Sequence, residues 1–150
     1  MNEDIKYMRK ALIEAHKAEL IDEVPIGCVI VKDNKIIARG YNKKERSNDV
    51  TSHAEIIAIR KACKKLNSWR LIDCELYVTL EPCAMCAGAI YQSRIKRVIY
   101  GTSDPKQGAL GGAIDLYDCK TLNHYPEVTK NILKEECSNK ISEYFRKKRK

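Results

Sequence analysis

Apolar residues follow two patterns along this chain, helical spacing in three segments and short unbroken runs between them. Helical spacing predicts one helix over about residues 3–20, a second from near His53 to about Leu66, and a third that closes the chain. The apolar faces of the first and the closing helix are formed by Ile5, Met8, Leu12 and Ala15 and by Ile132, Cys137, Ile141, Tyr144 and Phe145.

The short apolar runs predict strands. Cys28–Val31 and Ile36–Ala38 flank Asp33-Asn34, a pair that favours a tight turn, so we expect a β-hairpin there. Further strands are expected, in chain order, at residues 76–80 and 97–100 and, as a short strand or turn, at 127–129. Alternating strands and helices are typical of the α/β class and predict a three-layer α/β/α sandwich around one mixed sheet. A length of 150 residues predicts a single domain over 1–150.

The chain carries a formal net charge of +8, which favours an anionic partner, although charge alone does not identify one. Lys43, Lys44 and Arg46 lie in a polar segment before the second helix, and Lys106 lies in a Gly-rich loop. Basic residues also fill positions 146–150. Such a run is usually a solvated tail, but this one continues the closing helix, so we expect the helix to hold these charges near the functional site.

The first residues are polar and acidic, and no apolar run approaches the roughly 20 residues that a bilayer span needs, so no membrane association is expected. Seven cysteines, an odd number with apolar neighbours, fit a reduced cytoplasm better than a set of disulfides. Cys28, Cys63 and Cys137 are predicted to be small core residues. The sequence assigns no role to Cys74 or Cys119.

Candidate chemistry concentrates in two short motifs, H-A-E and P-C-A-M-C. Cys83 and Cys86 stand three residues apart, so they share one face of a helical turn and can bind one metal ion. With His53 they supply three zinc ligands, one fewer than a closed structural site, which leaves the fourth position to water. Glu55 follows the histidine closely enough to exchange protons with that water. The set predicts a hydrolytic site with one Zn²⁺ per subunit.

Less specific interpretations of the same residues also exist. A C-x-x-C pair is often a redox pair or half of a zinc ribbon. Ser52 or Thr51 is expected to cap the helix near His53, and Ser52 with Glu55 also fits a capping box, which would make Glu55 structural. Pro82 suits the first position of the cysteine helix. No second C-x-x-C completes a ribbon, and a strand-like run leads into the cysteine turn, so we favour catalytic zinc.

The H-x-E and P-C-x-x-C pair is the zinc signature of nucleobase deaminases in general. Flanking segments across nearly the whole chain narrow the choice: VPIG at 24–27, GYN at 40–42, WRL at 69–71, LYVTLEPCAMCAGAI at 76–90, SRI at 93–95, RV at 97–98, DPK at 104–106 and YFR at 144–146. With these segments the chain resembles the bacterial tRNA-specific adenosine deaminases of the cytidine/deoxycytidylate deaminase superfamily.

This resemblance implies a five-stranded cytidine-deaminase-like fold and the hydrolytic conversion of the wobble adenosine of tRNA to inosine, with release of ammonia. Glu55 would carry the protons. The partner would be the tRNA anticodon stem-loop, and the enzyme a homodimer with residues 87–90 and 93–95 at its interface. The substrate-binding positions that it implies are Ile26, Asn42, Asp104, Lys106, Tyr144, Phe145, Arg146 and Arg149.

The chain departs from the family pattern at Tyr144, where phenylalanine is commoner, and at Gly112, where the Gly-rich loop usually has serine. Two other functions remain open. One is deamination of a free base or nucleotide, such as guanine, cytosine or dCMP, by the same zinc chemistry. The other is a structural-zinc RNA-binding module, which would need a fourth protein ligand. Asn42 and the basic closing helix favour the tRNA substrate, and His124 is expected to be structural.

Overall fold

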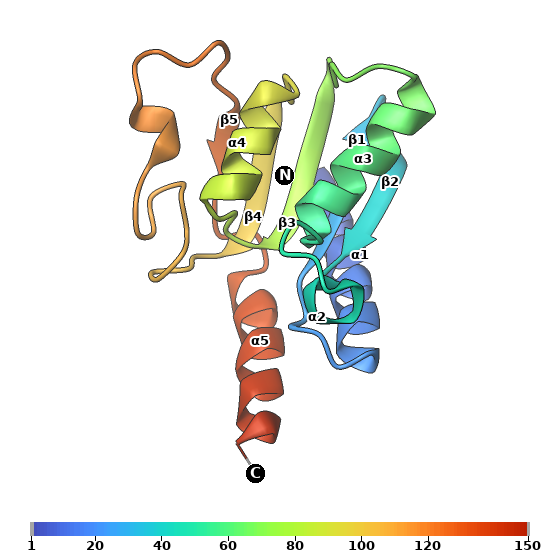
Figure 1. The fold of residues 1–150 in the computed structure, drawn as a ribbon, viewed down its shortest axis with the longest axis vertical. Coiled ribbons are helices and arrows are strands. Elements are labelled where there is room, and N and C mark those ends of the chain that lie inside the picture. Colours follow the sequence, from blue (N-terminus) through green and yellow to red (C-terminus); the bar gives the residue numbers. More distant parts are fainter. Residues whose placement is uncertain (1, 150) are drawn as a thin grey trace.

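The computed structural model describes residues 2–149, which form one five-stranded sheet with helices on both faces (Figure 1). The strands are β1 (Gly27–Lys32), β2 (Lys35–Tyr41), β3 (Cys74–Leu80), β4 (Arg97–Thr102) and β5 (Glu127–Thr129). They lie in the order β2-β1-β3-β4-β5. β1 pairs antiparallel with β2 and β3, whereas β3, β4 and β5 run parallel. The predicted mixed sheet is therefore confirmed.

Helices pack on both faces of the sheet (Figure 1). α3 (Ala54–Leu66) and α4 (Ala84–Gln92) pack on one face, and α1 (Asn2–Leu20) and α5 (Lys134–Lys148) pack on the other. Successive residues of a strand point to opposite faces, so one strand serves both layers. In β3, Leu76 and Val78 join the core under α3 and α4, whereas Tyr77 packs with Met8 of α1. The predicted three-layer sandwich is confirmed.

The expected hairpin between β1 and β2 is also confirmed. Asp33 and Asn34 have φ values of 51° and 61°, the left-handed backbone of a type I′ turn. Short polar side chains tolerate this conformation better than branched ones, because they can hydrogen-bond locally. The sequence pair thus sets the turn type and the pairing beside the turn, and a bulge between Ile30 and Val31 shifts the register of the rest of the hairpin.

The segment before His53 differs from the expected polar loop, because it contains a short helix, α2 (Lys44–Ser47). The buried carboxylate of Glu23 holds the start of α2 by accepting the backbone N–H groups of Glu45 at 3.1 Å and Arg46 at 2.6 Å. A helix of four residues has no apolar periodicity, so the pattern of the sequence could not predict it. A 3-10 turn, η1 (Leu116–Asp118), lies in the connection to β5.

The cysteines lie largely as predicted. Cys28 and Cys137 are buried in the core and Cys63 is half-buried on α3. Cys74 is buried at the start of β3 and Cys119 is exposed. All seven cysteines fall within the described range and are free thiols. Within residues 2–149, none of the helices combines the length and the apolar character needed to cross a membrane.

Two parallel strands bring the functional segments together. β3 leads directly into the cysteine turn before α4, and β4 leads into the Gly-rich loop. Because both strands end at the same edge of the sheet, the two segments lie side by side. α5 extends past the sheet on this same side (Figure 1). The carboxyl edge is where open α/β sheets bind their ligands.

Candidate active site

The N-termini of α3 and α4 face each other at this edge. His53 is the N-cap of α3 and Cys83 is the N-cap of α4, and neither side chain makes a capping hydrogen bond. The predicted cap by Ser52 or Thr51 is therefore wrong, because the Thr51 hydroxyl instead donates to Asp49 Oδ1 at 2.7 Å. At their caps, the histidine and the cysteine side chains remain free to face each other.

The cysteine helix also begins two residues later than predicted. Pro82 lies before the N-cap of α4 rather than at its first helical position. Its carbonyl accepts the N–H of Ala109 at 2.9 Å, which joins the segment between β3 and α4 to the Gly-rich loop. The turn that carries Cys83 is consequently fixed from both sides, by α4 and by the loop.

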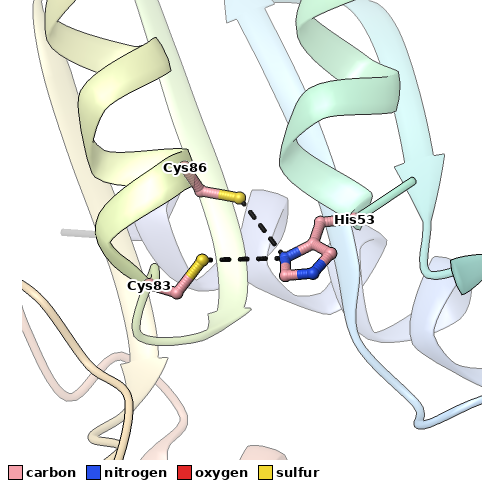
Figure 2. A group of neighbouring side chains, drawn as sticks. All are labelled: His53, Cys83 and Cys86. Atoms are coloured by element: carbon pink, nitrogen blue, oxygen red, sulfur yellow. Dashed lines mark hydrogen bonds between the residues drawn. The ribbon is translucent and has the colours of Figure 1, made fainter. Parts of the chain in front are cut away.

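His53, Cys83 and Cys86 converge on one point (Figure 2). The Nδ1 atom of His53 lies 3.7 Å from Cys83 Sγ and 3.5 Å from Cys86 Sγ. Both sulfur atoms point toward the same ring nitrogen, although the histidine comes from α3 and the cysteines from the start of α4 (Figure 2). Among residues 2–149, these three form the one group of histidine, cysteine or acidic side chains close enough together to hold a metal ion.

The spacing of these donors fits a tetrahedral metal. Ligand bonds of about 2.3 Å to sulfur and about 2.0 Å to nitrogen place a nitrogen and a sulfur about 3.6 Å apart in a tetrahedron. The observed nitrogen–sulfur separations are 3.7 and 3.5 Å. One imidazole and two thiols also suit a borderline-soft ion. A structural site would need a fourth protein donor, and the part of the chain that the structure describes brings none to this cluster.

The two thiols of the cluster differ in acidity. A hydrogen bond from Cys86, and a further one from His53, lower the pKa of Cys83 to about 4. The bond to Cys83 raises the pKa of Cys86, and burial of Cys86 raises it further. Cys83 is therefore the sulfur that ionises more readily, and the thiolate is the form of cysteine that binds a metal ion. The structure thus favours metal binding over an inert pair of core cysteines.

Glu55 lies in the first turn of α3, two residues after His53. Only 4% of its surface is exposed. Burial disfavours the charged carboxylate, and the negative charge of Cys83 adds to this effect, so the pKa of Glu55 rises to about 7. A carboxyl group with a pKa near neutral can both accept and donate a proton, which is what general acid–base catalysis requires.

A cavity of about 550 Å³ opens in front of the cluster. It is lined by Val24, Ile26, Asn42, Lys44, Val50, His53, Ala54, Glu55, Leu80, Glu81, Cys83, Asp104 and Gln107. Three of the predicted substrate positions, Ile26, Asn42 and Asp104, thus lie in its wall. Asn42 is partly engaged already: its Nδ2 donates to Val24 O at 3.3 Å, and its Oδ1 accepts from Lys44 N at 3.2 Å. The amide retains a second N–H for a ligand.

A second hollow of about 330 Å³ adjoins the cavity and reaches α5. The two share Val24, Leu80 and Asp104 in their walls. On the side of α5, the hollow is lined by Ser138, Ile141, Ser142 and Phe145. Phe145 is therefore placed beside the candidate site, as the prediction for the closing helix required.

The remaining predicted positions do not line the cavity. Lys106 is exposed on the Gly-rich loop, and Arg146 and Arg149 are exposed on or just after α5. The hydroxyl of Tyr144 donates to the backbone oxygen of Asp22 at 3.1 Å, so this side chain packs against the end of α1. Lys150, the last of the basic residues, lies outside the described residues.

Glu81 is a functional candidate that the sequence did not single out. It is 2% exposed, lines the cavity and directly precedes the cysteine turn. Its carboxylate accepts hydrogen bonds from four groups of the Gly-rich loop, contributed by Ser103, Asp104, Leu110 and Gly112. An acidic residue between the apolar end of a strand and the cysteine turn was the available signal, because a buried carboxylate must find hydrogen-bond donors. His124, by contrast, is structural as expected, with Nε2 2.7 Å from Ile95 O.

Together these features define a class of protein. A five-stranded mixed sheet, an open three-donor cluster at its carboxyl edge and a buried glutamate beside the cluster are the features of a hydrolytic deaminase.

The comparisons with known proteins specify the family. The MafB19-like deaminase family matches residues 2–149. The chain is 50% identical over 147 residues to the tRNA-specific adenosine deaminase of Haemophilus influenzae, which covers 97% of this chain and 85% of the relative. The chain therefore belongs to the MafB19-like deaminases and, within them, groups with the tRNA-specific adenosine deaminases.

Solved structures agree with this grouping. A structure from a study of A-to-I editing by tRNA:A34 deaminases at the wobble position superposes with a TM-score of 0.87 at 46% identity, covering 90% of this chain and 98% of that one. The guanine deaminase of Bacillus subtilis superposes with a TM-score of 0.64 at 37% identity, covering 95% and 92%. The cytidine-deaminase-like fold implied by the resemblance is confirmed.

Proposed function

We propose that this protein is a zinc-dependent deaminase that hydrolyses the wobble adenosine of a tRNA anticodon loop to inosine and ammonia. The observation that carries the chemistry is the open cluster of His53, Cys83 and Cys86 with the buried Glu55 at the mouth of one cavity. Water adds to C6 of adenine, and the bond from C6 to the amino nitrogen breaks. The products account for every atom of adenosine and water.

His53 Nδ1 and the two cysteine sulfurs would hold one zinc ion per subunit. When bound, zinc lowers the pKa of a coordinated water to about 7. Glu55 would accept one proton from the attacking water and deliver it to ring N1, and would then accept the second proton of the same oxygen and deliver it to the departing amine. Its raised pKa supports both directions of transfer near neutral pH. The surrounding apolar wall, which includes Ile26 and Leu80, would exclude other water.

The nature of the substrate rests on the comparisons together with the shape of the site. The structural match to the tRNA:A34 deaminase study is closer, in identity and in TM-score, than the match to the guanine deaminase. The second hollow beside the cavity provides room for nucleotides that flank the target base. A free base has no flanking nucleotides, so it would not contact this hollow or the basic residues of α5. The wobble adenosine is therefore the preferred substrate over a free base or nucleotide.

Contacts to the anticodon stem-loop would come from residues around the two hollows. Ile26 would pack on the target base, and Asn42 would donate its remaining N–H to it. Asp104 and Phe145 would face the flanking nucleotides, where an aromatic ring can stack on an unpaired base. The exposed or half-exposed positions Lys106, Tyr144, Arg146 and Arg149 would contact the backbone and outer bases.

We also propose that the chain acts as a single deaminase domain in the cytoplasm and as a homodimer. Within the predicted interface, Ala87, Ile90 and Ile95 are buried in the subunit itself. The outward surface of α4, which includes Gly88 and Ala89, would therefore make the contact together with Arg94. Sedimentation equilibrium would test the dimer, and a monomer at micromolar concentration would refute it.

The deciding experiment compares two kinds of substrate, an RNA stem-loop and free bases or nucleosides, with the zinc-loaded protein. Inosine formation is measured by mass spectrometry in an anticodon stem-loop with adenosine at the wobble position, and ammonia release is measured with free adenosine, guanine and cytosine. We expect conversion of the stem-loop alone. A stem-loop with guanosine at the wobble position is the matched substrate control, and E55Q is the matched protein control.

Two results would contradict the proposal. Turnover of a free base with an unchanged stem-loop would leave the zinc chemistry in place and refute the substrate. Loss of zinc on substitution of a cysteine outside the cluster, as complete as the loss in C83A, would identify a closed structural site and refute the enzyme.

A further inference from the structure

Glu81 stands between the metal cluster and the Gly-rich loop without belonging to either. It follows the last residue of β3 and precedes Pro82 and Cys83, and its carboxylate is buried beneath residues 103–112. This loop supplies Asp104 and Gln107 to the wall of the main cavity. This Gly-rich loop comprises residues 103–112 and is called the 103–112 loop below.

The carboxylate of Glu81 is saturated with hydrogen bonds. Oε1 accepts the Ser103 hydroxyl at 2.9 Å and the Asp104 N–H at 2.9 Å. Oε2 accepts the N–H groups of Leu110 at 2.9 Å and Gly112 at 2.8 Å. A carboxylate has about four acceptor positions, so none remains for a substrate proton. Glu81 therefore differs in role from Glu55, which lines the cavity and is the residue proposed to carry protons.

The loop depends on these bonds for its shape. Between its two attachment points, the Asp104 carbonyl accepts Gly108 N–H at 2.9 Å, and Asp104 Oδ1 accepts the N–H groups of Lys106 and Gln107 at 3.1 and 3.2 Å. The position of Asp104 thus decides the position of the residues that follow it. Asp104 is in turn held through its own N–H by Glu81.

The glycines of the loop show how closely it surrounds the carboxylate. A Cβ atom added at Gly108 would lie 2.3 Å from Cδ of Glu81, and one at Gly112 would lie 2.5 Å from its Oε1 and 2.3 Å from Asp104 O. No side chain fits at either position without moving the loop. Gly112, where the family pattern has serine, therefore has no room for a Cβ atom in this chain.

We propose that Glu81 is a positioning residue for substrate binding: its carboxylate holds the 103–112 loop in the conformation that puts Asp104 and Gln107 in the cavity wall, independently of the metal ligands. The loop also has a backbone contact to the metal turn, Ala109 N–H to Pro82 O, that does not use the side chain of Glu81. Loss of the carboxylate should therefore loosen the loop and weaken substrate binding while the zinc cluster stays formed. The part that concerns RNA rests on the proposed function.

The test uses E81Q, which keeps the size of the side chain but turns one acceptor oxygen into an N–H₂ donor. In either orientation of the amide, two loop donors then face another donor. The first measurement is limited trypsin digestion of the zinc-loaded protein, followed by mass spectrometry of cleavage after Lys106, an exposed residue of the loop. We expect the initial rate of this cleavage to rise about tenfold or more, with zinc still at one per subunit. This measurement does not depend on what the substrate is.

The second measurement is the split between KM and kcat for the stem-loop, supported by its Kd in an E55Q background. We expect E81Q to raise KM and Kd about tenfold or more and to lower kcat by less than about threefold. E75Q is the matched control, because Glu75 is an acidic residue of the same strand that bonds Arg97 rather than the loop. It should leave cleavage after Lys106 and KM unchanged.

A second variant tests the same contact from the loop side, should E81Q not fold. G112A inserts a methyl group against Glu81 and Asp104, whereas A113S adds one atom at the next residue, which is exposed. G112A should reproduce the faster cleavage and the higher KM, and A113S should not. Wild-type cleavage rates in both E81Q and G112A would overturn the proposal. An inactive wild-type enzyme on the stem-loop would instead refute the proposed function, and the cleavage rates would still decide the role of Glu81.

Discussion

Two clusters of ionisable side chains lie at opposite ends of β3, and they use burial for opposite purposes. At the start of β3 and β4, Arg97 bonds Asp4 through two nitrogens at 2.9 and 2.7 Å and Glu75 at 2.8 Å. Tyr77 donates to the same aspartate at 2.7 Å. Every charge there has an opposite partner. After the end of β3, the metal cluster and Glu55 face a cavity.

The pKa values record this difference. The hydrogen bonds from Arg97 hold the pKa of Asp4 below its ordinary value despite its burial. Glu55 is buried without a cation of that kind, and its pKa rises to about 7. A paired carboxylate stays charged and ties α1 to the sheet. The pKa of a buried carboxyl group without a cationic partner rises toward neutral pH, where the group can both accept and donate a proton. Burial of a carboxyl group therefore supports stability at one end of β3 and chemistry at the other.

The largest expected effect comes from removing a ligand of the metal cluster. C86A should lose bound zinc and all measurable deamination, because two donors hold the ion far more weakly than three. C137A is the matched control, since Cys137 is an equally buried thiol on α5. Metal content by atomic emission separates the two variants. A zinc-loaded C86A would show that the ion binds elsewhere.

Next in size is the loss of the proton carrier. E55Q should retain zinc and fold normally but lose about 10³-fold in kcat, within the range for general acid–base groups. The measurement is single-turnover inosine formation beside a zinc assay. Near-normal turnover would remove Glu55 from the chemistry and make it a structural residue of the first turn of α3.

At the paired end the expected effect is on stability alone. D4N should lower the free energy of unfolding by about 2 kcal/mol at pH 7, because Arg97 loses a charged partner, while kcat stays unchanged. The folded pKa of Asp4 is depressed, so its stabilisation is full above the ordinary pKa of about 3.9 and is lost as pH falls through the folded value. Urea titrations should therefore show the gap between wild type and D4N closing below about pH 4. A gap independent of pH would contradict this account.

The smallest effect is expected on α5. Y144F restores the commoner family residue and removes the bonds from the hydroxyl to Asp22 O and Asp22 Oδ1, on a partly exposed surface. We expect the Tm to change by less than about 2 °C and the stem-loop Kd by less than about threefold. Differential scanning fluorimetry and fluorescence anisotropy check this. A large loss of affinity would mean that the contact with Asp22 sets the direction of α5.

Much of the architecture was predictable because its signals are local. The apolar spacing over α1 and α3 and the Asp33-Asn34 turn each depend on neighbouring residues alone. The cap positions were predicted wrongly for two reasons: Asp49 binds the Thr51 hydroxyl in a local turn that competes with capping, and Pro82 is engaged by Ala109, which is distant in the sequence. The short helix α2 was missed for the same reason, since Glu23 holds it from another part of the chain.

The chemistry of the site was predictable from the residue types. An open metal site is expected in any fold that brings together an imidazole, two thiols at helical spacing and a carboxylate two residues from the histidine. Their meeting depends on packing, because His53 and Cys83 are separated by a strand and reach each other only when α3 and α4 lie on the same face of the sheet. The same holds for Glu81. Its type and position are visible in the sequence, but the four donors that saturate it come from a loop more than twenty residues away, and only the folded chain brings them within hydrogen-bond distance.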